Sequence, residues 1–193
     1  MNERKCTTER KTRETHVRME LNIDGKGLTN VNTGIKFLDH LLVTLTKRSS
    51  FDLRVEATGD LGHHLIEDVG LVLGEALLSA LGEKKGIKRF GFAYVTMDDS
   101  LSRTVVDLGG RPYFVANLDL QQNKVEDVMS EDIEHFFMSF AHASKSNVHI
   151  AVLYGKNDHH KIESATKALA LALREAVSQD PKLDSVPSAK GVL

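Results

Sequence analysis

The chain has 193 residues, of which 41% are hydrophobic, and this length suits one substantial domain or two smaller fused units. A formal charge of -2 excludes any general electrostatic attraction to nucleic acid or to an anionic membrane surface. The single cysteine, Cys6, excludes a disulfide framework, and no apolar run is long enough to span a bilayer, so we expect a cytoplasmic protein.

The first half of the chain predicts strands and helices in alternation. Apolar residues at every second position indicate half-buried strands over residues 15–23 and 51–57. Apolar residues at helical spacing predict a helix over 35–46, and a largely buried helix follows the second strand. We expect the first ten residues, which are mostly polar, to be frayed. The charged stretch 82–91 is interpreted as the connector at the midpoint of the chain.

The second half predicts a similar order of elements. Strands are expected over residues 92–97, 101–108, 113–120 and 148–152. A helix is expected over 130–142, before the last of these strands, with Ser130 as its N-cap. A long apolar helix to Val177 and a short tail follow. Strands and helices mixed in this order favour an α+β fold in which helices pack on one face of each sheet.

One short motif occurs twice, about half a chain apart. Residues 62–67 read GHHLIE and residues 158–163 read DHHKIE, and each copy leads into an apolar run. A further histidine, His40 or His135, precedes the first histidine of each copy by 23 residues in one case and by 24 in the other. We therefore predict an internal duplication of one α+β unit. The two halves are residues 1–91 and 92–193.

Each copy of the motif offers metal ligands in helical geometry. Positions i and i+4 share a face of a helix, so His159 and Glu163 converge on one ion while His160 points elsewhere. The economical arrangement is reciprocal, because the second histidine of each copy then serves the ion of the other copy. One predicted ligand set is His63, Glu67, His135 and His160, and the other is His159, Glu163, His40 and His64. Imidazole and carboxylate donors without thiolate suit Mn, Fe, Co, Ni or Zn, and the spacing does not choose among them.

Basic and hydroxyl residues outside the motif are candidates for a phosphate site. Such side chains in turns and in the tail bind phosphate by charge-assisted hydrogen bonds when they converge. The candidates are Arg89, Arg111, Lys167, Ser188 and Lys190. Taken singly, each of them is typical of a solvated surface residue, and so is Glu14.

Several longer motifs resemble one enzyme family over nearly the whole chain, from about Arg10 to Leu193. They are FLDH at 37–40, FDL at 51–53, HH at 63–64 with EDVG at 67–70, EHFF at 134–137, GKNDHH at 155–160 and PSAKG at 187–191. On these motifs the chain resembles the imidazoleglycerol-phosphate dehydratases of histidine biosynthesis. The resemblance implies a carbon-oxygen lyase that removes water from imidazoleglycerol phosphate to give imidazole-acetol phosphate.

The resemblance also implies a cofactor, an assembly and residue roles. It implies two Mn²⁺ ions per subunit and a homo-oligomer of 24 subunits in which metal sites are completed across subunit contacts. The implied fold has two similar halves, each a four-stranded sheet with helices on one face, like the second domain of ribosomal protein S5. Glu14 matches the family glutamate that transfers a proton. The positions matched to substrate and phosphate binding are Arg89, Arg111, Lys167, Ser188, Ala189, Lys190 and Gly191.

Three positions depart from the family pattern. Gly62 and Leu65 replace an aspartate and a threonine around the first histidine pair, so a carboxylate that orients a histidine is expected to be missing. Ala189 replaces a hydroxyl residue and removes one hydrogen bond. The alternative function is a non-catalytic metal-binding assembly protein in which the ions only join subunits. The phosphate candidates and Glu14 discriminate between the enzyme and the assembly protein, because metal ions that only join subunits need neither phosphate ligands nor a proton-transfer group.

Overall fold

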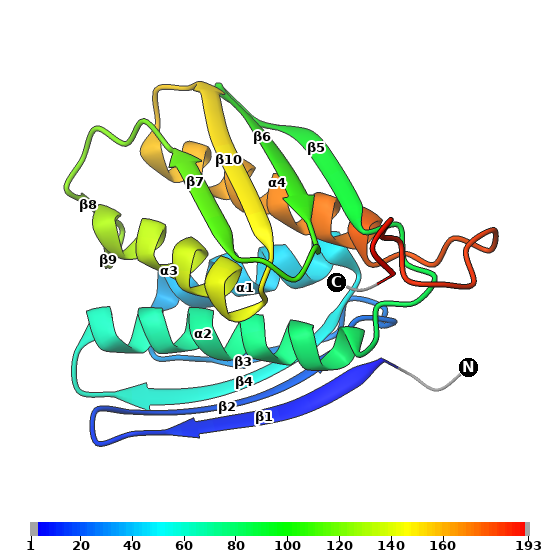
Figure 1. Ribbon diagram of the computed structural model, residues 1–193. Helices are drawn as coiled ribbons and strands as arrows, with labels where there is room; N and C mark the ends of the chain where they lie inside the picture. The colour runs from blue at the N-terminus through cyan, green and yellow to red at the C-terminus, as the bar shows by residue number, and fades with distance from the viewer. Residues whose placement is uncertain (1–3, 192–193) are drawn as a thin grey trace.

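Two four-stranded sheets enclose four helices in the computed structural model, which describes residues 4–191 (Figure 1). The first sheet, in the order β1-β2-β4-β3, contains β1 (Lys5–Lys11), β2 (Thr15–Asn22), β3 (Thr29–Asn32) and β4 (Asp52–Gly59). The second sheet, in the order β5-β6-β10-β7, contains β5 (Phe90–Met97), β6 (Ser100–Asp107), β7 (Tyr113–Asn117) and β10 (Asn147–Tyr154). The helices are α1 (Lys36–Ser49), α2 (Gly62–Leu81), α3 (Ser130–Ala143) and α4 (Asp158–Ala176).

Both sheets are built in the same way. In the first sheet, β2 pairs antiparallel with β1 and β4, and β3 runs parallel to β4. In the second sheet, β6 pairs antiparallel with β5 and β10, and β7 runs parallel to β10. A helix joins the parallel neighbours in each case, α1 after β3 and α3 after β7. This common topology confirms an α+β fold of two similar halves, whereas the division between residues 91 and 92 stays a prediction.

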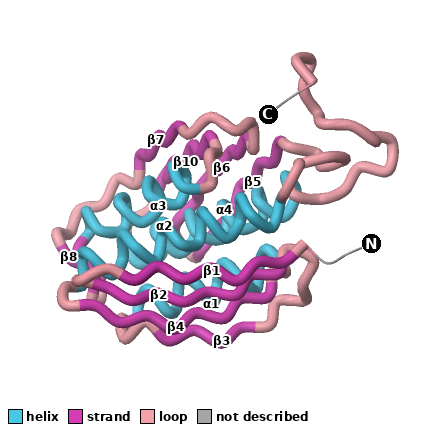
Figure 2. Tube along the Cα trace, turned by 60° about the horizontal axis from the view of Figure 1, so that its bottom comes forward, coloured by secondary structure: helices cyan, strands magenta, loops and turns pink. Residues whose placement is uncertain are grey.

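The core lies where the helices meet the inner faces of the two sheets, as the turned view shows (Figure 2). Strand β2 illustrates how the sequence selects this arrangement, because Val17, Met19 and Leu21 are buried and the residues between them are not. Such alternation places one face of a strand against the core and the other against solvent. Helix α2 packs on β1, β2 and β4 of the first sheet and also against α3, which explains why it is apolar around much of its circumference.

The helices pair across the two halves. Helix α1 of the first half packs against α4 of the second, and α2 packs against α3. The approach of α2 to α3 is close because glycines face the partner helix: a Cβ atom built on Gly70 would lie 2.7 Å from the carbonyl oxygen of Phe136. This pairing brings His40 on α1 to the start of α4, and His63 on α2 to the start of α3. Each histidine cluster therefore draws residues from both halves.

Replacing Gly74 by alanine is expected to destabilise the fold. The added methyl group would lie 2.5 Å from the carbonyl oxygen of Phe140 and 2.7 Å from the Cβ of Ala143, so α2 and α3 must separate. Overpacking of this kind costs about 1–3 kcal/mol. Gly62→Ala is the matched control, because its new Cβ would meet only the Cδ1 of Ile35, at 3.9 Å. Thermal unfolding followed by circular dichroism measures both, and equal melting temperatures would contradict the close packing.

Two expectations about individual segments are wrong. The expected fraying is wrong for residues 5–10, because β1 pairs with β2 along its whole length, from Lys5 to Lys11, and residues 1–3 lie outside the described part of the chain. Ser130 is the first residue of α3 and not its N-cap, which is Met129. The Ser130 hydroxyl donates instead to the carbonyl oxygen of Gln122, since the preceding loop folds back over the helix start.

Besides β1, strand β3 and one hairpin have no counterpart among the predicted elements. Strand β3 pairs with β4. A short hairpin of β8 (Lys124–Val125) and β9 (Val128–Met129) precedes α3. Strands of four or two residues are too short to show a hydrophobic period. They are defined by their pairing with a neighbouring strand and not by a pattern in the sequence.

Candidate metal centre

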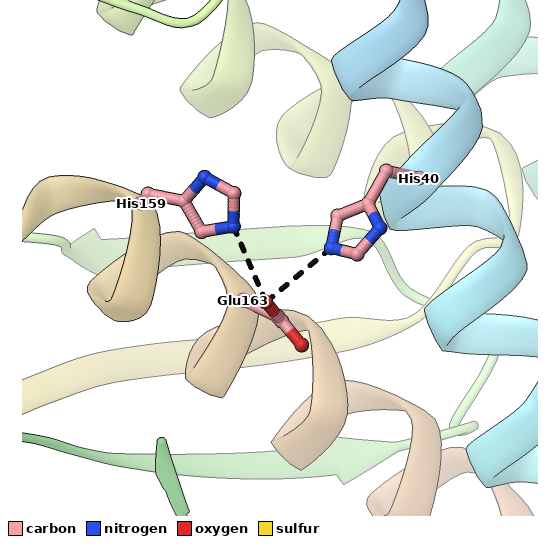
Figure 3. A group of neighbouring side chains, drawn as sticks. All are labelled: His40, His159 and Glu163. Carbon is pink, nitrogen blue, oxygen red and sulfur yellow. Dashed lines mark hydrogen bonds and ion pairs between the residues drawn. The ribbon is translucent and has the colours of Figure 1, made fainter. Parts of the chain in front are cut away.

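The side chains of His40, His159 and Glu163 converge at the starts of two paired helices (Figure 3). The Nε2 atoms of His40 and His159 each lie 3.3 Å from Oε2 of Glu163. One ligand atom from each residue lies within 4.8 Å of the others, and within residues 4–191 no second group of three histidine, cysteine or acidic residues meets this spacing. These three residues belong to one of the two predicted ligand sets.

Helix geometry produces this convergence. His159 and Glu163 are four residues apart on α4 and therefore share a face, while α1 supplies His40 from the other half of the chain. The Phe37 ring packs against the His159 ring, with 5.0 Å between their centroids, and so limits its rotation. Glu163 is buried, and a buried carboxylate needs a cationic partner or a metal ion.

The second predicted ligand set is assembled only in part. The rings of His63 on α2 and His135 on α3 lie 5.1 Å apart, and Glu67 follows His63 by four residues on the same helix. Neither His64 nor His160 belongs to the group formed by His40, His159 and Glu163. Within one chain, His160 thus lies outside the group that its neighbour His159 joins.

Each of the four paired histidines has a carboxylate at its Nδ1 atom. The pairs are His63 with Asp132 at 2.6 Å, His64 with Asp60 at 2.9 Å, His159 with Glu126 at 3.0 Å and His160 with Asp99 at 2.6 Å. A carboxylate accepts a hydrogen bond, so Nδ1–H donates and Nε2 keeps the lone pair that binds a metal. Nitrogen and oxygen donors arranged in this way fit a divalent transition-metal ion. The expectation that the first pair lacks an orienting carboxylate is wrong, because Asp60 supplies one four residues before His64.

Neighbouring charges and hydrogen bonds favour the ionised form of Glu163 and the protonated form of His64. Burial opposes ionisation of Glu163, but hydrogen bonds from Lys167 and His40 outweigh it and lower the Glu163 pKa. The hydrogen bond to Asp60 raises the pKa of His64, and the nearby Glu14 charge adds to this effect. The glutamate candidate therefore stays ionised, as a ligand must.

Glu14 lies beside the first histidine pair. It stands in the turn between β1 and β2, where its Oε2 is 3.8 Å from Nδ1 of His64. Its carbonyl oxygen accepts a hydrogen bond of 3.0 Å from the backbone N–H of Asp60, which ties the turn to the start of α2. Its side chain is 59% exposed and so is accessible to a substrate.

Most of the candidate phosphate ligands line one cavity of about 350 Å³. Its lining residues are Arg89, Gly109, Gly110, Arg111, Ser188, Ala189 and Lys190. A hydrogen bond to Asp107 raises the pKa of Arg89 and fixes its guanidinium, with 2.7 Å from Nε to Oδ1. Two candidates lie elsewhere: Gly191 does not line the cavity, and the Nζ of Lys167 is 2.8 Å from Oε1 of Glu163.

The cavity and the histidine cluster lie at opposite ends of α4. His159 occupies the first turn of this helix, whereas the backbone N–H of Arg89 bonds to the carbonyl oxygen of Ala176, the last helical residue. A helix of 19 residues is about 28 Å long. Figure 1 shows the same separation between the start of α4 and the tail. A small phosphorylated molecule cannot reach both groups within one chain.

Sequence reasoning missed the four orienting carboxylates. Two of them had a readable signal: Asp99 directly precedes β6 as Glu14 directly precedes β2, its counterpart in the duplication, and Asp60 lies four residues before His64. Asp132 and Glu126 have no such signal, because helix packing and a hairpin bring them to the histidines.

Fold and site together define a class of protein: a duplicated α+β fold whose helix starts carry paired histidines and glutamates suited to metal binding. The family model described as imidazoleglycerol-phosphate dehydratase matches residues 33–173. Imidazoleglycerol-phosphate dehydratases of Caldanaerobacter subterraneus and Methanococcoides burtonii are 48% and 50% identical, and the alignments cover 98% and 95% of this chain and 100% and 96% of theirs. The chain belongs to the imidazoleglycerol-phosphate dehydratase family.

Solved structures agree with this membership. The Staphylococcus aureus dehydratase has a TM-score of 0.84 and 35% identity, with coverage of 91% of this chain and 99% of that one. The Pyrococcus furiosus enzyme, in complex with (S)-C348, has a TM-score of 0.84 and 34% identity, with coverage of 96% and 100%. The protein is therefore a hydro-lyase of histidine biosynthesis, which sets aside the non-catalytic alternative. None of the helices in the described residues is long and apolar enough to cross a membrane.

Proposed function

We propose that the protein catalyses the Mn²⁺-dependent dehydration of imidazoleglycerol phosphate to imidazole-acetol phosphate. The observation that carries this proposal is the convergence of His40, His159 and Glu163, whose ligand atoms all lie within 4.8 Å of one another. The expected cytoplasmic location stays a prediction, based on the single cysteine and the lengths of the apolar runs in the sequence.

Two ions per chain would be held by the two ligand sets. The first set is His40, His159 and Glu163 with His64 of a second copy, and the other is His63, Glu67 and His135 with His160 of a second copy. When bound, such ions act as Lewis acids toward the imidazole of the substrate and orient it. The side chain of Lys167 keeps the Glu163 carboxylate ionised and turned toward the histidines.

Assembly of several copies is part of the same proposal, with 24 copies in the complete particle. The 28 Å or so along α4 between histidine cluster and phosphate cavity supports it, because one substrate then has to bind groups from different chains. An apolar outer face of the second sheet gives further support, since Phe92, Tyr94 and Tyr113 are all more than half exposed there. Exposed aromatic patches of this kind are typical of protein interfaces.

Residues that are not metal ligands are assigned proton transfer and phosphate binding. Glu14 is accessible, lies beside His64 and is assigned the transfer of the proton at the reacting carbon. Arg89, Arg111, Ser188 and Lys190 around the cavity are assigned the phosphate group, together with the backbone near Ala189 and Gly191.

Arg111→Ala is expected to weaken substrate binding. The Arg111 side chain lines the phosphate cavity and makes no ion pair within the described residues, so its donors are available to an anion. Loss of a charge-assisted hydrogen bond costs about 1.5–3 kcal/mol, which raises KM about 10-fold to 100-fold. Arg103→Ala, on the exposed outer face of β6, is the control for lost positive charge. Equal KM values for the two variants, measured in steady-state assays, would argue against the phosphate assignment.

The proposed reaction is tested by incubating the Mn²⁺-loaded protein with imidazoleglycerol phosphate and measuring formation of the keto product. We expect turnover that disappears when a chelator removes the ion and returns when Mn²⁺ is restored. Full turnover in metal-free protein would contradict the metal dependence. Absence of turnover in correctly assembled, metal-loaded protein would contradict the reaction itself.

A further inference from the structure

The turn of the β8–β9 hairpin touches both helices that carry the His40, His159 and Glu163 group. This turn consists of Glu126 and Asp127 and is called the hairpin turn below. The Oε1 atom of Glu126 lies 3.0 Å from Nδ1 of His159, at the start of α4. Asp127 bonds to the first residues of α1, which carries His40 one turn further on. Two adjacent side chains thus contact the two helix starts from which the histidines project.

Asp127 caps a helix that has no cap of its own. The N-cap residue of α1 is Ile35, whose side chain makes no capping hydrogen bond. The carboxylate of Asp127 replaces it from 90 residues away, accepting from the backbone N–H of Lys36 at 2.8 Å and of Phe37 at 3.0 Å. Unpaired N–H groups at a helix start need such an acceptor, and its negative charge also suits the helix dipole. The position of His40 therefore depends on the hairpin turn.

Glu126 occupies a backbone conformation that favours glycine. Its φ angle is +55°, in the left-handed region that L-residues with a side chain adopt at a cost in energy. A hairpin turn alone is satisfied better by glycine at such a position. Strained residues of this kind often mark functional sites, and here the strained residue places its carboxylate on a candidate metal ligand. The side chain of Glu126 therefore has a role beyond forming the turn.

We infer that the hairpin turn is a positioning element for one of the two metal centres, with Glu126 fixing the tautomer and ring orientation of His159 and Asp127 fixing the start of α1. This inference rests on the proposed metal binding. Hydrogen bonds that ligand histidines donate to carboxylates hold the ring and raise its basicity, and their removal weakens metal binding about 10-fold to 100-fold.

The other centre does not use this turn. Its His63 bonds to Asp132, which projects from α3 and is buried, with a side chain 7% exposed. The carboxylate of Glu126 is 57% exposed and stands on a two-strand hairpin. The two centres of one chain therefore differ in how their histidines are held, and a change at Glu126 acts on one ion alone.

The decisive variant is Glu126→Gly, which removes the carboxylate and supplies the residue that the backbone angle favours. We expect one of the two Mn²⁺ ions per chain to bind about 10-fold to 100-fold more weakly, measured by competition with a chelator and by metal analysis. The melting temperature of the metal-free protein should be unchanged or higher, because the strain at the turn is relieved. If Glu126 were purely structural, the affinity for both Mn²⁺ ions would be unchanged and the melting temperature of the metal-free protein would fall.

Two further variants complete the test. Glu126→Gln keeps an acceptor for Nδ1–H without the charge and should fall between wild type and Glu126→Gly. Glu131→Gln removes the same charge from an exposed residue at the start of α3 that has no contact with a ligand histidine, and should bind both ions as wild type does. If Glu126→Gly keeps both affinities while the wild type binds two ions, the positioning role is refuted. If the wild type binds no divalent ion, the proposed metal function fails as well.

Discussion

Glu14→Gln is expected to remove most of the turnover while leaving metal content and assembly unchanged. Glutamine has the same shape but cannot accept or release a proton, and a positioned general acid or base contributes about 100-fold to 10,000-fold to the rate. The side chain is exposed and lies 3.8 Å from His64, so its replacement disturbs no core packing. The loss should therefore fall on kcat, measured with saturating substrate and Mn²⁺.

Glu9→Gln is the matched control for this variant. Glu9 lies on β1, and its Oε1 is 2.7 Å from Nε2 of His16, away from the candidate ligands. It should keep wild-type kcat. A Glu14→Gln protein with comparable activity would rule out the acid/base role, and one that loses its metal would show that Glu14 serves the metal centre instead.

His160→Ala is expected to lower metal binding at the site that contains Glu67 and not at the site that contains Glu163. In one chain the His160 ring does not join the group around Glu163, and its Nδ1 bonds to Asp99 at 2.6 Å. Its Nε2 lies 3.5 Å from Oδ2 of the exposed Asp98 and, in the reciprocal scheme, binds an ion held by a second copy. Metal analysis after dialysis should give about one tightly bound ion per chain instead of two.

Double variants show which ion His160 serves without the need to locate it. Residues that serve one ion are not additive, so adding Glu67→Gln to His160→Ala should cause little further loss. Adding Glu163→Gln should remove the remaining ion, because it belongs to the other ligand set. The reverse pattern would refute the reciprocal scheme. His149→Ala is the control, since His149 stacks on Tyr113 on the outer face of the second sheet.

The sequence predicted the parts of the fold that repeat. Both long strands of the first half and all four helices have clear hydrophobic periods, and the duplicated motif revealed the symmetry before any packing was known. The strand β1 was missed because its polar residues alternate without a strong apolar face, and its pairing with β2 forms it. Ser130 was misplaced by one residue, because a serine at a helix start looks the same whether it caps the helix or begins it.

In the site too, local spacing predicted some contacts, whereas tertiary packing forms the others. Helical spacing predicted that His159 and Glu163 converge, and the duplication predicted that His40 joins them. Pairing of α1 with α4 is a tertiary event, and so are the contacts of Asp99, Glu126 and Asp132 with the histidines, whereas the contact of Asp60 with His64 is local. Glu126 reaches His159 from 33 residues away and Asp132 reaches His63 from 69 residues away, so no local pattern contains them. Lys167 was assigned to phosphate by its charge, whereas its position beside Glu163 depends on the helix register.

Each chain is expected to build half of two shared metal centres at its helix starts. Crystals of the Mn²⁺-loaded protein, measured at the manganese absorption edge, test this arrangement most directly by anomalous scattering. We expect two peaks per chain. One should lie among His40, His159 and Glu163 with His64 of a neighbouring copy, and the other among His63, Glu67 and His135 with His160 of a neighbouring copy. A single peak per chain, or peaks whose ligands all come from one chain, would contradict it.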